Sequence, residues 1–192
     1  MGDAFTVYWP QDRWLAALHT TAPLEVLFGG PHTSLPSFVR ATVKAGDVLY
    51  PIGVWQQVLH VFGRARVREI TEADGSERDR FRRWRFLAPT CTTEVVHVDD
   101  GTRILGDRAV PGATLKTITY LPRRGPRPIK HVDDQGMLTR ALSVQGIYRL
   151  APESAATLEA LVTGPATAPG RLPPRRESRW RPVPSMGAEP LF

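Results

Sequence analysis

The densest basic segment of residues 1–163 lies at 77–86, where arginines are interleaved with aromatic residues. Arg82 and Arg83 stand between Phe81 and Trp84. Guanidinium groups bind phosphates through paired hydrogen bonds, and aromatic rings stack on bases. The segment therefore predicts contact with RNA or DNA. If the segment forms a strand, a solvent-exposed face of arginines and a buried opposite face would explain the pattern nearly as well, without any bound nucleic acid.

A second basic segment, residues 122–131, contains no acidic residue. Its four cations are Arg123, Arg124, Arg127 and Lys130. Because no neighbouring carboxylate neutralises them, this predicted loop is the more specific electrostatic signal for a phosphate backbone. We expect all four side chains to belong to a nucleic-acid-binding surface.

Two similar short segments, His-Val-Asp-Asp-Gly at 97–101 and His-Val-Asp-Asp-Gln-Gly at 131–136, support a competing hypothesis. Within them, His97, Asp99 and His131 are the ligand types of a two-histidine, one-carboxylate iron site. The simpler interpretation is a strand end followed by a turn, since Asp and Gly suit turn geometry. Because no anchor for a co-substrate can be placed, we expect no metal, no cofactor and no catalytic residue.

The elements that would position these side chains include a hairpin at residues 46–68. In its second half one parity of residues is apolar or small, and the other ends in Arg64, Arg66 and Arg68. Successive strand residues point to opposite faces, so the apolar parity should face the core. Arg64 and Arg66 should then lie on an exposed face, available to nucleic acid.

Two residues predict irregularities in this hairpin, and the remaining segments predict the fold class. Gly63 indicates a bulge or a close backbone approach, and Pro51 indicates an edge strand or a bend. Further strands are predicted at residues 5–9, 93–98 and 113–121, and helices at 11–19 and 151–162. This order favours an α+β domain with a curled, mixed or antiparallel sheet over alternating βαβ units.

Composition sets the domain boundary. The 192 residues suffice for one well-buried domain, and the single cysteine, Cys91, cannot form an internal disulfide. Residues 164–192 are rich in proline and hold five arginines against two glutamates, half of the net charge of +6. We therefore expect a domain at 1–163 and a flexible tail at 164–192. The lack of a long apolar stretch and of a signal-peptide pattern predicts a cytoplasmic protein with no membrane partner.

Three stretches together resemble PUA-like domains, particularly their EVE, YTH and ASCH branches. They are the hairpin at 43–70, the closing segment at 141–162, and an opening at 5–14 in which Pro10 and Trp14 match the EVE-type start. The chain lacks the Gly-x-Lys-x-x-Glu-x-Arg signature of ASCH proteins and the Trp-x-Gly-Val-Arg-Asn run of EVE proteins.

The resemblance implies a PUA-like pseudo-barrel of five or six strands, flanked by short helices, that binds RNA or holds a modified base in an aromatic cage. It places Trp9, Trp14 and Trp55 at the pocket walls, and Tyr50 lies on the hairpin between them. Tryptophans in small domains are usually core residues, so Trp55, at a turn with polar neighbours, is the better candidate.

We therefore predict a nucleic-acid-binding domain that recognises a modified or flipped base, with RNA or DNA as its partner. Two other hypotheses fit the sequence. One is a small enzyme on the same fold, either a ribonuclease or a metal-dependent oxygenase that uses His97, Asp99 and His131. The other is a protein-interaction module whose tail docks a partner through its prolines.

Overall fold

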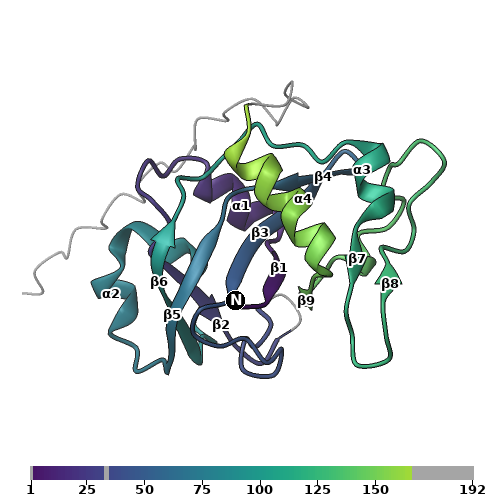
Figure 1. Ribbon diagram of the computed structural model, residues 1–192. Helices are drawn as coiled ribbons and strands as arrows, with labels where there is room; N and C mark the ends of the chain where they lie inside the picture. The colour runs from purple at the N-terminus through teal and green to yellow at the C-terminus, as the bar shows by residue number, and fades with distance from the viewer. Residues whose placement is uncertain (1, 33–34, 166–192) are drawn as a thin grey trace, which may run out of the picture.

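A mixed seven-stranded sheet organises the computed structural model, which describes residues 2–32 and 35–165 (Figure 1). The strands are β1 (Ala4–Tyr8), β2 (Val26–Gly29), β3 (Val48–Trp55), β4 (Val58–Val61), β5 (Ala65–Glu72), β6 (Glu94–Gly101), β7 (Thr119–Tyr120), β8 (Arg127–Pro128) and β9 (Ile147–Arg149). The helices are α1 (Gln11–Ala17), α2 (Glu77–Arg80), α3 (Gly112–Thr117) and α4 (Pro152–Thr163), with 3-10 turns η1 (Arg82–Leu87) and η2 (Ala141–Ser143). The predicted α+β class is confirmed.

The strands follow the order β2-β6-β5-β3-β1-β9, with β4 paired to β3. Only the β1–β3 pair of this sheet is parallel. The β7–β8 hairpin extends the β9 edge, because the Leu121 N–H donates to the Arg149 carbonyl at 2.8 Å. The mixed sheet is thus confirmed, with seven strands instead of five or six, and within the described residues its order does not close into a barrel.

Both faces of the sheet are covered. One face buries the core that contains Trp9, Trp14 and Phe62, and the other buries Tyr50 and Leu158. Helix α4 crosses the second face, with α3 and the β7–β8 hairpin beside it (Figure 1). Within the described residues, every helix is too short or too polar to cross a lipid bilayer.

This double burial corrects the expected faces of the hairpin. His60 and Phe62, predicted on the exposed parity, are only 2% and 1% exposed, because the sheet has a core on each side. Leu59 and Val61 are buried as predicted. The alternation of exposed and buried residues begins only at Arg66, after the chain has passed from β4 to β5.

Pro51 lies inside the sheet, so of the two predicted alternatives, an edge strand or a bend, the edge strand is wrong. Strand β3 pairs with β5 through Val48 and Leu49 and with β4 from Ile52 onward. Proline has no backbone N–H to donate to a ladder, and Pro51 falls where the partner of β3 changes. Its carbonyl still accepts the Phe62 N–H at 2.8 Å.

Gly63 confirms the prediction of a close backbone approach. A Cβ atom at this position would lie 2.6 Å from the Thr102 hydroxyl oxygen, and φ is +154°. The same hydroxyl accepts the Arg64 N–H at 2.9 Å. A side chain at residue 63 would therefore displace the loop that follows β6.

The strand predicted at 113–121 is wrong over residues 113–117, which belong to α3, and strand structure is present only at Thr119 and Tyr120. Residues 77–86, considered above as a possible strand, form α2 and most of η1. The other predicted elements are present as β1, α1, β6 and α4, whose first residue is Pro152. Helix α4 ends at Thr163, and the predicted tail lies, from residue 166 onward, outside the described residues.

Candidate nucleic-acid interface

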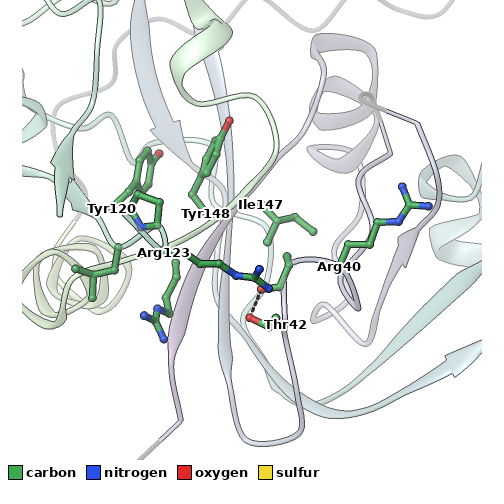
Figure 2. A pocket seen from close by; sticks show the side chains of 10 residues that line it. Arg40, Thr42, Tyr120, Arg123, Ile147 and Tyr148 are labelled. Carbon is green, nitrogen blue, oxygen red and sulfur yellow. Dashed lines mark hydrogen bonds between the residues drawn. The ribbon is translucent and has the colours of Figure 1, made fainter. Parts of the chain in front are cut away.

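A pocket of about 410 Å³ opens at the β9 edge of the sheet. Three segments that are far apart in the sequence line it: the turn at 40–42, the chain at 120–123 that leaves β7, and β9 at 147–149. Figure 2 shows Tyr120 and Tyr148 on one side of the pocket and Arg40 on the other, with Ile147 between them. The extension of the sheet edge by β7 creates this concave surface.

The aromatic wall of the pocket is a pair of tyrosines. The ring centroids of Tyr120 and Tyr148 lie 4.9 Å apart, with an angle of 32° between the planes. Burial raises the pKa of the Tyr120 hydroxyl, which accepts a 3.4 Å hydrogen bond from Thr6. Tyr148 is half-buried, and its hydroxyl donates to the Gln145 carbonyl at 2.8 Å. Tyr120 is thus fixed in the core and supports the more accessible Tyr148.

Arg127 completes this wall. Its guanidinium carbon lies 5.3 Å from the centre of the Tyr148 ring, within the range of a cation–π contact. Gly146 lies against the same ring, since a Cβ atom there would be 3.4 Å from its outer atoms. Tyr148 is therefore held from several sides, and a flat guanidinium is part of the surface beside the pocket.

The pocket is electropositive. Its lining includes Arg40, Arg123 and Arg149 and contains no aspartate or glutamate. Arg149 also forms an ion pair with Asp3 at 3.3 Å, but both side chains are more than 40% exposed, so solvent weakens that pair. An anionic ligand would find positive charge here on three separate chain segments.

The turn that supplies Arg40 is anchored by a carboxylate at the start of β6. Glu94 accepts hydrogen bonds from the Ser37 hydroxyl and from the Phe38 N–H, the latter at 2.7 Å. Ser37 in turn accepts the Arg40 N–H at 3.0 Å. Thr42 has a φ of +64°, a region that threonine rarely adopts, so the turn needs such an anchor to keep its shape.

The acid-free basic segment contributes to this pocket in part. Arg123 lines it, and Arg127 stacks on its tyrosine wall. Arg124 and Lys130 are exposed and do not line the pocket. The β7–β8 hairpin therefore carries the charge predicted from the sequence to the edge of β9.

The aromatic residues placed at the pocket walls by the resemblance lie elsewhere. Trp9 and Trp14 are 2% and 0% exposed, and both stack on Phe62. Trp55 is half-buried and contacts Trp14 edge to face. Tyr50 is buried against α4. Because stacking a base on the two buried tryptophans would require opening the core, we do not carry them into the proposed interface.

The arginine row of the hairpin divides into structural and exposed members. Arg64 is mostly buried and lies between Asp100, at 2.6 Å, and Glu159, at 3.2 Å. Its hydrogen bond lowers the pKa of Asp100. Arg66 is exposed on β5. Arg64 thus joins α4 to the sheet and is not available to a phosphate in this arrangement.

Arg82 and Arg83 are exposed on η1, away from the residues that line the pocket. Trp84, the residue after Arg83, is fully buried. The alternation of arginines and aromatic residues in this segment therefore comes from a helical turn with one buried side.

The structure does not bring the three proposed iron ligands together. His97 is buried in β6 with its Nε2 3.1 Å from the Thr71 hydroxyl, whereas Asp99 and His131 are exposed. Within residues 2–32 and 35–165, no three His, Cys, Asp or Glu side chains are grouped to hold a metal. The second segment is a turn closed by Asp133, whose Oδ1 accepts the Gln135 and Met137 N–H groups at 3.0 and 2.8 Å.

Most of the pocket residues were missed by the sequence analysis. The missed residues are Arg40, Thr42, Tyr120, Tyr148 and Arg149. One signal was present, because Tyr120 lies two residues before the acid-free basic segment. Arg40 and Tyr148 lie in segments whose local patterns show no relation to that loop.

No protein-family model and no curated protein matches the sequence. Among the solved structures that match, three do so over 84% of this chain. They are the ASCH protein from Zymomonas mobilis (13% identity, TM-score 0.45, 96% of that chain), its serine-to-alanine variant (14%, 0.44, 97%) and its tyrosine-to-phenylalanine variant (13%, 0.46, 99%). ASCH is one of the three PUA-like branches that the sequence resembles. Likeness at this level does not assign a shared site, so the roles proposed below rest on the residues of this chain.

Proposed function

We propose that this protein binds single-stranded nucleic acid, with one nucleotide held in the pocket at the β9 edge. The observation that carries the proposal is the meeting of a tyrosine wall with three arginines and no carboxylate in one cavity. A nucleotide combines a flat apolar base with an anionic phosphate, and those are the two surfaces that this pocket offers.

The size of the pocket supports a single nucleotide. Ligand pockets span about 300–1,000 Å³, and this one, at about 410 Å³, is at the small end of that range. A duplex would present its phosphates but not its base faces. An unpaired or flipped base would reach Tyr148 and the Arg127 guanidinium, while Arg123 or Arg149 contacts the backbone. Recognition of a modified base would then depend on the fit against these side chains.

The lining favours binding over acid–base catalysis. None of its residues is a histidine, carboxylate or cysteine, the usual proton acceptors at an enzyme's reacting atoms. The Tyr148 hydroxyl already donates to a backbone carbonyl, and the pKa of Tyr120 is raised by burial. We therefore propose a binding site without a catalytic step of its own.

Titration of labelled single-stranded RNA and DNA decamers tests this function. Tyr148→Ala removes the accessible ring and should weaken binding by about 1 to 3 kcal/mol, that is, about five- to 150-fold. Tyr148→Phe keeps the ring and loses only the hydroxyl, so it should bind nearly as the unmodified protein does. Arg123→Ala should also weaken binding and make it less sensitive to salt.

A panel of modified and unmodified nucleosides tests the finer proposal of base recognition. Tyr148→Ala should abolish any preference among bases while leaving salt-sensitive binding of the backbone. If the folded protein binds no oligonucleotide at low salt, or if Tyr148→Ala binds as well as Tyr148→Phe, the proposed function is wrong.

A further inference from the structure

We infer that the 3-10 turn η1 forms a second, base-independent phosphate-binding surface, centred on Arg82 and Arg85. This inference rests on the proposed function, because it assigns the strand that enters the pocket a further contact on the protein. The turn lies outside the pocket and shares no residue with its lining.

The geometry of η1 separates its residues into an inward and an outward row. In a 3-10 helix, residues three apart lie above one another. Trp84 and Leu87 form the inward row, at 0% and 2% exposure. Arg82 and Arg85 form the outward row, and both are exposed. The buried tryptophan therefore fixes the backbone from which the two arginines project.

The spacing of the outward row suits a nucleic-acid strand. A 3-10 helix rises about 2 Å per residue, so the Cα atoms of Arg82 and Arg85 are separated by about 6 Å along its axis. Side chains of this length at that separation can contact neighbouring phosphates of one strand. Arg83, on the third edge of the turn, is also exposed and adds positive charge.

The protein compensates the charge of this surface only in part. Residues 77–87 contain five exposed arginines, namely Arg78, Arg80, Arg82, Arg83 and Arg85. Within the described residues, none of the five forms an ion pair. The two acids of the segment offset only part of this charge, because five arginines minus two carboxylates leave a net charge of +3. Asp79 is exposed, whereas Glu77 is turned inward, where its carboxylate accepts the Asp74 and Gly75 N–H groups at 2.8 and 2.9 Å. Arg64 and Arg68, by contrast, are paired with carboxylates.

A nucleic acid fits this surface better than a lipid membrane does. Basic helices that bind membranes also insert large apolar side chains into the bilayer. The exposed large hydrophobic residues of the described chain are Val39 and Leu142, and neither belongs to residues 77–87. The surface thus offers charge without an apolar anchor, as a phosphate backbone requires.

The pocket and η1 are connected through β2. The turn η1 packs against β2 and α1. The turn that carries Arg40 lies against the same strand, since a Cβ atom on Gly29 would be 2.7 Å from the Phe38 ring. Arg40 therefore lies on the β2 side of the pocket, the direction in which a bound strand would leave for η1.

Salt titrations with two oligouridylates, of four and twenty nucleotides, test the inference. In the double variant Arg82→Ala/Arg85→Ala, the slope of log affinity against log salt for the 20-mer should become shallower by about 1.4, since each single-strand phosphate contact contributes about 0.7. The 4-mer, which fills only the pocket, should bind unchanged. Tyr148→Ala should instead weaken both oligonucleotides.

Two controls accompany the double variant. Arg82→Lys/Arg85→Lys retains the charge and should restore most of the salt slope. Arg68→Ala/Arg103→Ala removes the same number of exposed arginines from β5 and the loop after β6, and it should leave the slope unchanged. Melting curves of all variants establish that they are folded.

The inference fails if the Arg82→Ala/Arg85→Ala protein and the unmodified protein show the same salt slope for the 20-mer. It also fails if the Arg68/Arg103 control loses as much, or if phosphatidylserine vesicles bind in place of the 20-mer. In the first two cases a loss of 4-mer binding by Tyr148→Ala would still support the proposed function. Absence of binding by both oligonucleotides would contradict the proposed function itself.

Discussion

The carboxylate of Glu94 accepts the backbone N–H of Phe38 at 2.7 Å and so ties the turn of Arg40 to the first residue of β6. Replacing Glu94 with alanine should release this turn. Hydrogen bonds to a charged acceptor contribute about 1.5 to 3 kcal/mol, and we expect a loss of stability of about that size. Oligonucleotide affinity should fall as well, because Arg40 and Thr42 would no longer be held at the pocket. Thermal melting and titration of the same preparation measure both effects.

Glu72 provides a matched control for this substitution. It lies directly opposite Glu94 in the β5–β6 register and is exposed. Like charges in directly opposed strand positions repel one another, so Glu72→Ala should leave stability unchanged or raise it slightly. An equal loss of stability and affinity in both variants would show that Glu94 acts only as one more strand residue.

Local patterns were sufficient for the parts of the fold that short-range chemistry decides. The periodicity of residues 11–19 and 151–162 predicted α1 and α4, and Gly63 predicted a close approach. Residues 113–117 misled, because an apolar alternation over so few residues fits a strand or one helical turn equally well. Pro51 misled because its missing N–H is harmless where β3 changes partners, which only the pairing reveals.

The pocket could not be predicted, because three distant segments build it. Residues 40–42, 120–123 and 147–149 meet only after β9 has paired with β1 and β7 has extended that edge. The charge of Arg123 was visible in the sequence, but the place of Tyr148 in the same pocket was not. The tryptophans predicted at the pocket walls belong to the core instead, where Trp9 and Trp14 are buried and Trp55 is half-buried.

Trp14 and Trp55 should respond differently to truncation. Trp14 has no exposed surface and stacks on Phe62 at 5.3 Å, so Trp14→Ala should cost about 3 to 5 kcal/mol of unfolding free energy. Trp55 is half-buried, and Trp55→Ala should cost less and leave oligonucleotide affinity unchanged. Urea denaturation measures the first effect. If the Trp55→Ala protein is folded but has lost its preference among bases, the aromatic residue that binds the base would instead be Trp55, on the hairpin.

Tyr50 should contribute to stability and not to binding. Its hydroxyl donates to the Glu159 carboxylate at 2.6 Å, and burial together with this bond raises the pKa of Tyr50. Tyr50→Phe should therefore cost about 1 kcal/mol, because Glu159 keeps contact with Arg64 and with water. Denaturation of this variant beside Tyr148→Phe, together with titrations, would distinguish the two tyrosines. Weaker oligonucleotide binding by folded Tyr50→Phe would place the network of Tyr50 in the interface.

His60 makes the stability of the fold sensitive to acid. The side chain is 2% exposed, stacks on Phe62, and within the described structure has no hydrogen-bond partner for either ring nitrogen. Burial therefore lowers the pKa of His60 below its usual value of about 6.5. Between the folded-state pKa of His60 and about pH 6.5, the unfolded chain therefore binds a proton that the folded chain excludes.

The sign of the effect follows from this difference in bound protons. Stability should be constant above about pH 6.5 and should fall as the pH drops from there toward the folded-state pKa, by up to about 1.4 kcal/mol per pH unit. His60→Leu removes the titrating group, so its stability should depend less steeply on pH between 6.5 and 5. Some dependence should persist, because burial lowers the pKa of His97 as well. Urea denaturation at half-unit pH steps measures the slope of unfolding free energy against pH. Identical slopes for His60→Leu and the unmodified protein would show that His60 has the same proton affinity in the folded and the unfolded chain.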